Sequence, residues 1–144
     1  MHPRLEMARI TRFGVSMDAE LLARFDELIR SRGYANRSEA IRDLVRERLV
    51  QQEWEEGVEV IGVITLLYEH RRRELTDQLT ELQHTCHELI AATMHIHLDE
   101  ENCLEILAVR GEGSQIKKLA DRLCGLKGVK HGKLAVTSTG KGLR

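Results

Sequence analysis

The chain has 144 residues, 42% of them hydrophobic and 31% charged, a composition that excludes a disordered protein and fits one ordinary domain or two small ones. Its net charge of -1 gives no whole-chain argument for a nucleic-acid or membrane partner, and no apolar run approaches the roughly 18–20 residues that span a membrane. Three cysteines and the lack of a leader pattern argue against a disulfide framework, so we expect a cytoplasmic protein.

A short strand and a helix are predicted after the first ten residues. The stretch RFGVSMD alternates apolar with small or polar residues, which predicts a strand with Arg12, Gly14 and Ser16 on its polar face. DAELLARFDELIRSRGY has apolar residues at helical spacing. It therefore predicts an amphipathic helix that Asp18 caps and Gly33 ends.

A second amphipathic helix is predicted from NRSEAIRDLVRERLV, where Asn36 and Glu39 have the spacing of a capping box. One strand and two helices in about forty residues bury too little apolar surface to be stable alone. We therefore expect two copies to pair their strands into a ribbon and their helices into a bundle.

Such a ribbon fits the major groove of DNA. Every cationic residue before Lys117 is an arginine, which forks onto guanine and phosphate better than lysine does. The backbone N–H groups that open the second helix suit a phosphate. The alternative is a dimerisation module that carries these side chains on its surface. The predicted DNA contacts are Arg12, Gly14, Ser16, Asn36, Arg37 and Ser38.

The stretches RFGVSMDAELLARFDELI and GYANRSEAIRD closely resemble the ribbon-helix-helix repressors. This resemblance implies a DNA-binding dimer in which the predicted strand faces the bases.

The remaining pattern predicts an α+β domain of order β-α-β-β-α-β, the ferredoxin-like arrangement. QQEWEEGV, before it, is either a linker or a helix tail. The predicted strands are 58–68, 90–98, 103–111 and 129–139, and the predicted helices are 71–89 and 114–128. The predicted organisation is an arm at 1–10, a ribbon-helix-helix domain at 11–51, a linker at 52–57, a ferredoxin-like domain at 58–138 and a tail at 139–144.

The stretch TMHIHLDEENCLEI predicts a hairpin that gathers metal ligands. On a strand His95 and His97 share one face, and we expect Met94, Ile96 and Leu98 to point to the core. Cys103 and Glu105 join the histidine face if the loop has the right parity. Two imidazoles and a thiolate suit a transition metal rather than calcium or magnesium.

A fourth ligand is available in QHTCHEL, where His84 and His87 lie three residues apart on one helix face. Spacing does not decide which histidine is used, nor whether it reaches its own hairpin or that of another chain. A tetrahedral site would favour zinc, whereas a planar site would favour nickel or copper. Cys86 and Cys124 fall on apolar helix stripes and are predicted core residues, and His131 is predicted to be solvated.

A ribbon-helix-helix stretch followed by LLYEHRRREL, QHTCHEL, HIHLDEENCLEI and GVKHGKL is similar to the nickel-responsive NikR family from about Arg12 to about Ala135. The resemblance implies an ACT-like C-terminal domain and a square-planar Ni(II), one per subunit, held by His95, His97 and Cys103 with His84 of another subunit.

The resemblance also implies a homotetramer, a dimer of dimers, that binds a palindromic operator and represses nickel uptake genes. Tyr68, His70 and Glu105 are expected behind the ligands, by resemblance and by strand parity. Glu39 and Asp43 match family acids linked to a second cation, although a solvated acidic face would give the same pattern.

Two other classes of protein share part of this pattern. An antitoxin has a ribbon-helix-helix unit, but its tail tends to be short and disordered, unlike residues 58–138. A metal hydrolase needs an open coordination position and a general base. Four ligands would close this site, so we predict that the chain is not an enzyme.

Overall fold

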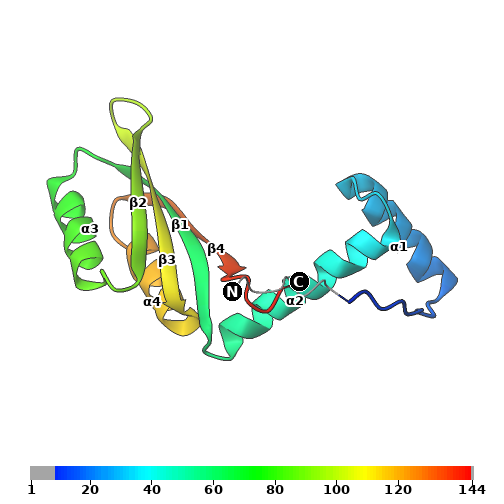
Figure 1. The fold of residues 1–144 in the computed structure, drawn as a ribbon. Coiled ribbons are helices and arrows are strands. Elements are labelled where there is room, and N and C mark those ends of the chain that lie inside the picture. Colours follow the sequence, from blue (N-terminus) through cyan, green and yellow to red (C-terminus); the bar gives the residue numbers. More distant parts are fainter. Residues whose placement is uncertain (1–8, 144) are drawn as a thin grey trace, which may run out of the picture. The chain divides into compact units, whose positions relative to one another are not determined.

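The computed structural model describes residues 9–143, so the first eight residues of the predicted arm lie outside the described part (Figure 1). The chain divides between Glu47 and Arg48 into two compact units. We call them the N-terminal and the C-terminal unit and describe each by itself.

The two predicted helices of the N-terminal unit are confirmed. Helix α1 is Ala19–Arg32, with Asp18 Oδ1 accepting hydrogen bonds from the backbone N–H groups of Glu20 and Leu21 at 3.0 and 3.2 Å. Gly33 ends it at φ +73°, in the left-handed region that glycine occupies without strain.

Helix α2 is Arg37–Glu55 and begins with the predicted side-chain cap. Asn36 Oδ1 accepts from the backbone N–H of Glu39 at 2.9 Å. The Glu39 carboxylate accepts in return from the backbone N–H of Ala35 at 3.3 Å, one residue earlier than in a standard capping box.

The predicted strand before α1 is absent from the single chain. Residues 11–17 carry no secondary structure, and their apolar side chains are exposed, Phe13 by 75% and Val15 by 60%. A strand requires a neighbour for its backbone hydrogen bonds, and within residues 9–143 none pairs with this segment. The apolar helix residues Leu21, Leu44 and Val45 are exposed as well. The N-terminal unit therefore leaves an apolar surface without a partner.

The stretch between the predicted domains is largely helical. Helix α2 continues through the first four residues of the predicted linker, so the helix-tail alternative holds there. Trp54, 6% exposed, donates from Nε1 to the Thr137 carbonyl at 2.7 Å. Gly113 lies so close that a Cβ there would come within 2.7 Å of the Trp54 carbonyl oxygen. The end of α2 is thereby anchored within the C-terminal unit.

The β-α-β-β-α-β order of the C-terminal unit is confirmed, and the fold class is α+β. The strands form one antiparallel sheet of order β2-β3-β1-β4. Its elements are β1 (Glu59–Glu69), α3 (Arg73–Thr85), β2 (Ile90–His97), β3 (Asn102–Glu112), α4 (Gly113–Cys124) and β4 (Val129–Ser138).

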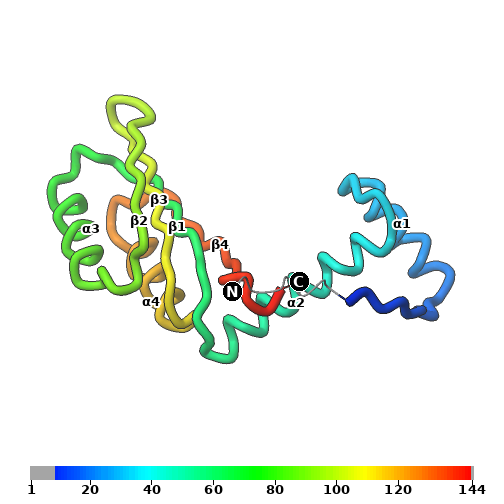
Figure 2. The backbone as a smooth tube through the Cα atoms, viewed as in Figure 1, coloured from blue at the N-terminus to red at the C-terminus, as the bar shows by residue number. Residues whose placement is uncertain are grey.

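The core lies between one face of the sheet and the helices α3 and α4, which lie on the same side of it (Figures 1 and 2). Burial alternates along β1 and β3, as expected for strands covered on one face. Ile64 and Leu107 are fully buried against helix residues such as Leu75 and Ile116. Among the described residues no helix is both long and apolar enough to cross a membrane.

The prediction that Met94, Ile96 and Leu98 point to the core is wrong. His97 pairs with the buried Cys103, so the histidines share the helix-covered side of the sheet. Met94 is instead 58% exposed and Leu98 52% exposed on the opposite face. The hydrophobic alternation identified two faces of the hairpin but did not identify which one the helices cover.

The two cysteines predicted to be core residues are only half buried. Cys86 follows the last residue of α3, where its backbone N–H caps the helix. Cys124 ends α4 against Gly132, and burial raises the pKa of its thiol. His131 is exposed, as predicted.

We expect Trp54→Ala to lower the free energy of unfolding of the C-terminal unit by about 3–5 kcal/mol, because a large buried side chain is removed. Trp54→Phe should cost about 1 kcal/mol for the bond to Thr137. Denaturant unfolding followed by circular dichroism measures both. A loss below about 1 kcal/mol for Trp54→Ala would show that α2 is not anchored in this way.

Candidate functional site

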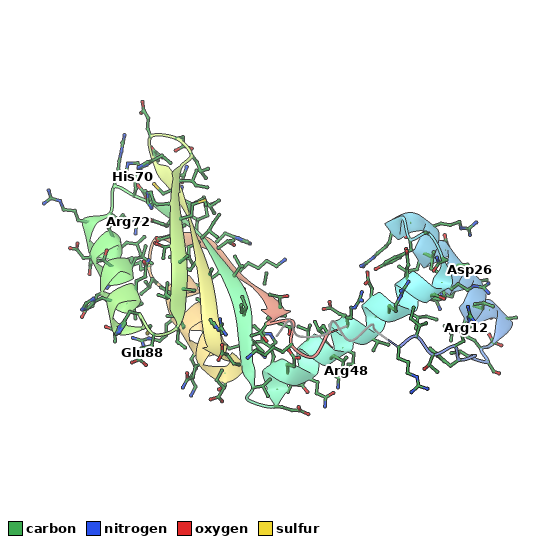
Figure 3. The ribbon with its side chains drawn as sticks, in the orientation of Figure 1. Arg12, Asp26, Arg48, His70, Arg72 and Glu88 are labelled. Carbon is green, nitrogen blue, oxygen red and sulfur yellow. The ribbon has the colours of Figure 1, made fainter. Side chains whose placement is uncertain are left out.

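Three potential metal ligands meet at one end of the sheet. His70, just after β1, His97 at the end of β2 and Cys103 at the start of β3 each offer a ligand atom, and these atoms lie within 4.8 Å of one another. The sheet register places both His97 and Tyr68 opposite Cys103. Cys103 Sγ lies 3.3 Å from His97 Nδ1. Figure 3 labels His70 at this end of the sheet, near the β2–β3 loop.

Two groups in this cluster lack the environment that they would have in water. Burial raises the pKa of the fully buried Cys103 thiol, and the carboxylates of Asp99 and Glu105 raise it further. His70 Nδ1 is buried without a hydrogen-bond partner. A bound cation would replace the thiol proton and give the unpartnered nitrogen an electron acceptor.

Behind the cluster a hydrogen-bond network joins β1, β2, β3 and α3. Tyr68 Oη donates to Glu105 Oε2 at 3.2 Å and lies 3.2 Å from His95 Nδ1. Gln83 Nε2 donates to Glu105 Oε1 at 2.6 Å. Burial, followed by the charge of Glu105, raises the pKa of Tyr68, so its hydroxyl stays protonated.

The network fixes one tautomer of His95. The single hydroxyl proton of Tyr68 is given to Glu105, so Tyr68 Oη can only accept from His95. His95 then carries its proton on Nδ1 and leaves the Nε2 lone pair free for a ligand. This assignment follows from the hydrogen bonds, since the proton itself is placed by inference.

The structure brings together most of the predicted metal-site residues of the hairpin. The rings of His95 and His97 lie 4.9 Å apart between centroids, and those of His70 and His97 lie 5.6 Å apart. His84 lies exposed on α3, with its ring near His87 at 6.3 Å. Within residues 9–143 it joins no group of ligand-competent side chains. The fourth predicted ligand is therefore not supplied to the cluster by the same chain.

Sequence reasoning missed Gln83. It follows Leu75 and Leu79, which are buried at four-residue spacing on α3, so a polar residue occupies the next position on that buried stripe. A polar side chain at a core position of a helix usually has a buried partner, and here that partner is Glu105. This break in the apolar stripe was the signal that could have identified it.

The predicted DNA contacts lie on an exposed segment and at a helix start. Arg12, Gly14 and Ser16 are exposed in the segment before α1, where Figure 3 labels Arg12. Asn36 caps α2. Arg37 forms a bidentate ion pair with Asp26, with both N–O distances at 2.8 Å, and this hydrogen-bonded pairing lowers the pKa of Asp26. Arg37 is therefore oriented at the N-terminus of α2 by a neighbouring carboxylate.

The two predicted ligands for a second cation are engaged in local hydrogen bonds. Asp43 Oδ2 accepts from the Tyr34 hydroxyl at 2.9 Å, which raises the pKa of Tyr34. Glu39 accepts from the backbone of Ala35. In the described part of the chain no third acidic, histidine or cysteine side chain gathers with this pair.

Comparison with known proteins identifies the family. A family model described as the NikR C terminal nickel binding domain matches residues 61–137, and one described as a ribbon-helix-helix protein of the copG family matches residues 11–52. The chain belongs to the nickel-responsive regulator family. Membership confirms the resemblance seen in the sequence and identifies a DNA-binding regulator rather than an enzyme.

The relatives match over nearly their whole length. Proteins from Geobacter sp. strain M21 and Geobacter sulfurreducens that carry the name nickel-responsive regulator are 55% and 54% identical, over 95% of this chain and 99% of theirs. A solved structure of an uncharacterized Thermotoga maritima protein, 22% identical, aligns with a TM-score of 0.51 over 56% of this chain and 99% of its own. That likeness supports the fold alone.

The donor atoms of this family member fit nickel. A buried thiol beside an imidazole nitrogen, with a second imidazole nitrogen left without a partner, is a soft to borderline set. Such a set suits nickel, copper or zinc and does not suit magnesium or calcium.

We expect Tyr68→Phe to weaken nickel binding by about 10- to 100-fold, because His95 loses the oxygen that fixes its tautomer. Competition with a chelator of known affinity measures the change. A matched control is Tyr34→Phe, which removes a hydroxyl of the N-terminal unit. Equal effects of the two substitutions would contradict the tautomer assignment.

Proposed function

We propose that this protein is a nickel-dependent DNA-binding repressor of nickel uptake genes. One Ni(II) per subunit would be held by His95, His97 and Cys103 together with His84 of a second copy. The observation that carries this proposal is the separation of His84 from an otherwise gathered thiol–imidazole cluster. A site that one chain leaves incomplete can report both metal and assembly.

The proposed ligands suit a planar ion. One thiolate and three imidazoles give a strong ligand field, which favours square-planar d⁸ nickel over an ion without a geometric preference. His95 and His97 are exposed at the edge of the sheet, where a second copy can approach. His84 is exposed on α3 and is free of the hydrogen-bond network around Glu105.

Two uncovered apolar surfaces support a homotetramer. In the N-terminal unit the residues of the predicted ribbon and of both helices expose apolar side chains, Phe13 and Leu44 among them. In the C-terminal unit the sheet face opposite the helices carries Ile61, Val63, Leu104, Ile106 and Met94. Two different self-complementary surfaces on one chain generate a dimer of dimers.

The two halves of the chain have separate proposed roles. We assign DNA binding to residues 11–51, a connecting segment to 52–57, and nickel binding with tetramerisation to 58–138, between the arm at 1–10 and the tail at 139–144. A ribbon from two copies would present Arg12, Gly14 and Ser16 to the bases, with Asn36, Arg37 and Ser38 at the phosphates. Its two-fold symmetry corresponds to a palindromic operator in cytoplasmic DNA.

Helix α3 is the element through which metal and DNA binding would be coupled. Gln83 hydrogen-bonds to Glu105 at the cluster, and the adjacent His84 would bind the metal of another subunit. Bound Ni(II) would favour the arrangement of subunits in which α3 is ordered and the ribbons fit an operator. A ligand shifts such an equilibrium only through its differential affinity for the two arrangements. Glu39 and Asp43 would hold a second cation beside α2 in that arrangement.

In a DNA-binding titration, we expect nickel to strengthen operator binding by about 10- to 100-fold, and His84→Ala to abolish this enhancement. His131→Gln, at an exposed histidine on β4, is the matched control and should respond as the parent protein does. Light scattering should show the same four-chain assembly for the parent and the control. Binding that is equal with and without nickel in the parent protein would rule out the switch.

We expect Arg12→Ala to weaken binding to the operator by about 1–3 kcal/mol and to relax base preference at one position of each half-site. Arg48→Ala, at an exposed arginine of α2, provides a matched loss of charge. Binding measured on a set of operator variants separates base readout from phosphate contact, which would weaken all sequences equally. A uniform loss for Arg12→Ala would place this residue at the backbone instead of the bases.

A further inference from the structure

We propose that His70, His97 and Cys103 form a second coordination mode of this centre, which takes a tetrahedral ion such as zinc within a single chain and does not use His84. The inference extends the proposed function, since it concerns how the same centre discriminates among metals. Its three ligand atoms lie within 4.8 Å of one another, and His95 is not among them.

The two modes share His97 and Cys103, so one chain can adopt only one of them at a time. His95 is separated from the trio by its hydrogen bond to Tyr68, which directs His95 toward the mode shared between subunits. His70 is the residue that distinguishes the single-chain mode. Its ring stands edge-on to His97 at an interplanar angle of 87°.

His70 has an unsatisfied atom at this position. Its Nδ1 is buried and has no hydrogen-bond partner, whereas buried polar atoms in folded proteins are nearly always paired. A hydrogen-bonding role behind the nickel ligands would require a partner for this nitrogen, and none is present among the described residues. An ion shared with Cys103 and His97 would satisfy it.

The backbone around His70 is held in place by the β2–β3 loop. The His70 N–H donates to the Glu101 carbonyl at 3.0 Å. Asp99 orders that loop by accepting from the backbone N–H groups of Glu101 and Asn102 at 2.8 and 2.7 Å. Lys130 donates to Asn102 Oδ1 at 2.6 Å from β4. The trio is therefore built on a braced loop rather than on one free side chain.

The trio opens to solvent, which provides its fourth ligand. A shallow cleft lined by His70, Arg71, His97, Leu98, Asp99 and Glu100 leads to it. Two imidazoles and one thiolate with water in the remaining position make a common tetrahedral zinc site. With both imidazoles neutral, zinc binding releases one proton, that of the Cys103 thiol, to the solvent.

A zinc ion held in this way would occupy the centre without linking subunits. It would use His97 and Cys103 and so exclude nickel, but it would leave His84 and helix α3 without a metal bond. Affinity alone separates neighbouring divalent metals poorly, so a difference in which ligands they recruit provides a second basis for discrimination.

Metal titrations of the full chain carrying His70→Gln, His84→Ala or His131→Gln test this proposal. Cobalt(II) serves as the spectroscopic probe of tetrahedral thiolate coordination, and zinc and nickel affinities come from chelator competition. We expect His70→Gln to abolish the visible cobalt band and to weaken zinc at least tenfold more than it weakens nickel. His84→Ala should do the reverse, and His131→Gln should match the parent protein.

A variant His70→Cys, which keeps a ligand at this position, should restore the cobalt band with a stronger sulfur-to-metal transition and thereby excludes misfolding as the cause. The proposal is overturned if His70→Gln keeps the parent cobalt spectrum and zinc affinity, or if His84→Ala weakens zinc as much as nickel. If His84→Ala instead leaves planar nickel binding intact, the shared nickel site is wrong, while His70→Gln still decides the single-chain mode.

Discussion

The register of the β2–β3 hairpin is the constraint on which the rest of the centre depends. It pairs His97 with Cys103 and His95 with Glu105, so the ligands and the supporting carboxylate share the helix-covered face. A shift by one residue would move all of them to the open face, because side chains alternate along a strand. Asp99 holds the turn that sets this register, and its hydrogen bonds from Asn102 and Glu101 lower its pKa to about 2. The loop thus retains its carboxylate acceptor at any pH near neutrality.

The same register places a carboxylate in the core, and its burial explains the network around it. Glu105 is 8% exposed, which would be costly for an unpaired carboxylate. The donors from Tyr68 and Gln83 offset that cost. Each donor also links a further element to the centre, since Tyr68 reaches His95 and Gln83 belongs to α3. The stability of the core and the geometry of the metal centre therefore depend on one side chain.

Local sequence signals predicted the elements well because their causes are local. The caps at Asp18 and Asn36, the glycine that ends α1 and the two hydrophobic periods are each determined by a few neighbouring residues. Signals that depend on more than one segment were less informative. The face of β2 that is buried is set by the position of α3 and α4, so Met94 was assigned to the core although it is exposed.

The candidate site shows the same limit. Spacing placed His95, His97 and Cys103 on one hairpin, because two strands and a turn are enough to define their face. His70 precedes them by more than twenty residues and joins them only through the pairing of β1 with β3, which no short pattern reveals. The strand before α1 was predicted as half of a ribbon, and a single chain contains no second half to pair with it. Pairing between distant segments and between chains is therefore what sequence pattern left undetermined.

The two coordination modes connect metal identity with assembly. Divalent metals late in the first transition row bind nitrogen and sulfur ligands in an order that the protein can alter little, so a regulator must respond to geometry rather than to occupancy alone. In this chain the pair His97–Cys103 is common to both modes, while His95 and His70 lie on either side of His97. A planar ion recruits the exposed side and needs a neighbour, and a tetrahedral ion recruits the buried side and does not. Discrimination would then arise from which subunits become linked, even where two metals bind with similar strength.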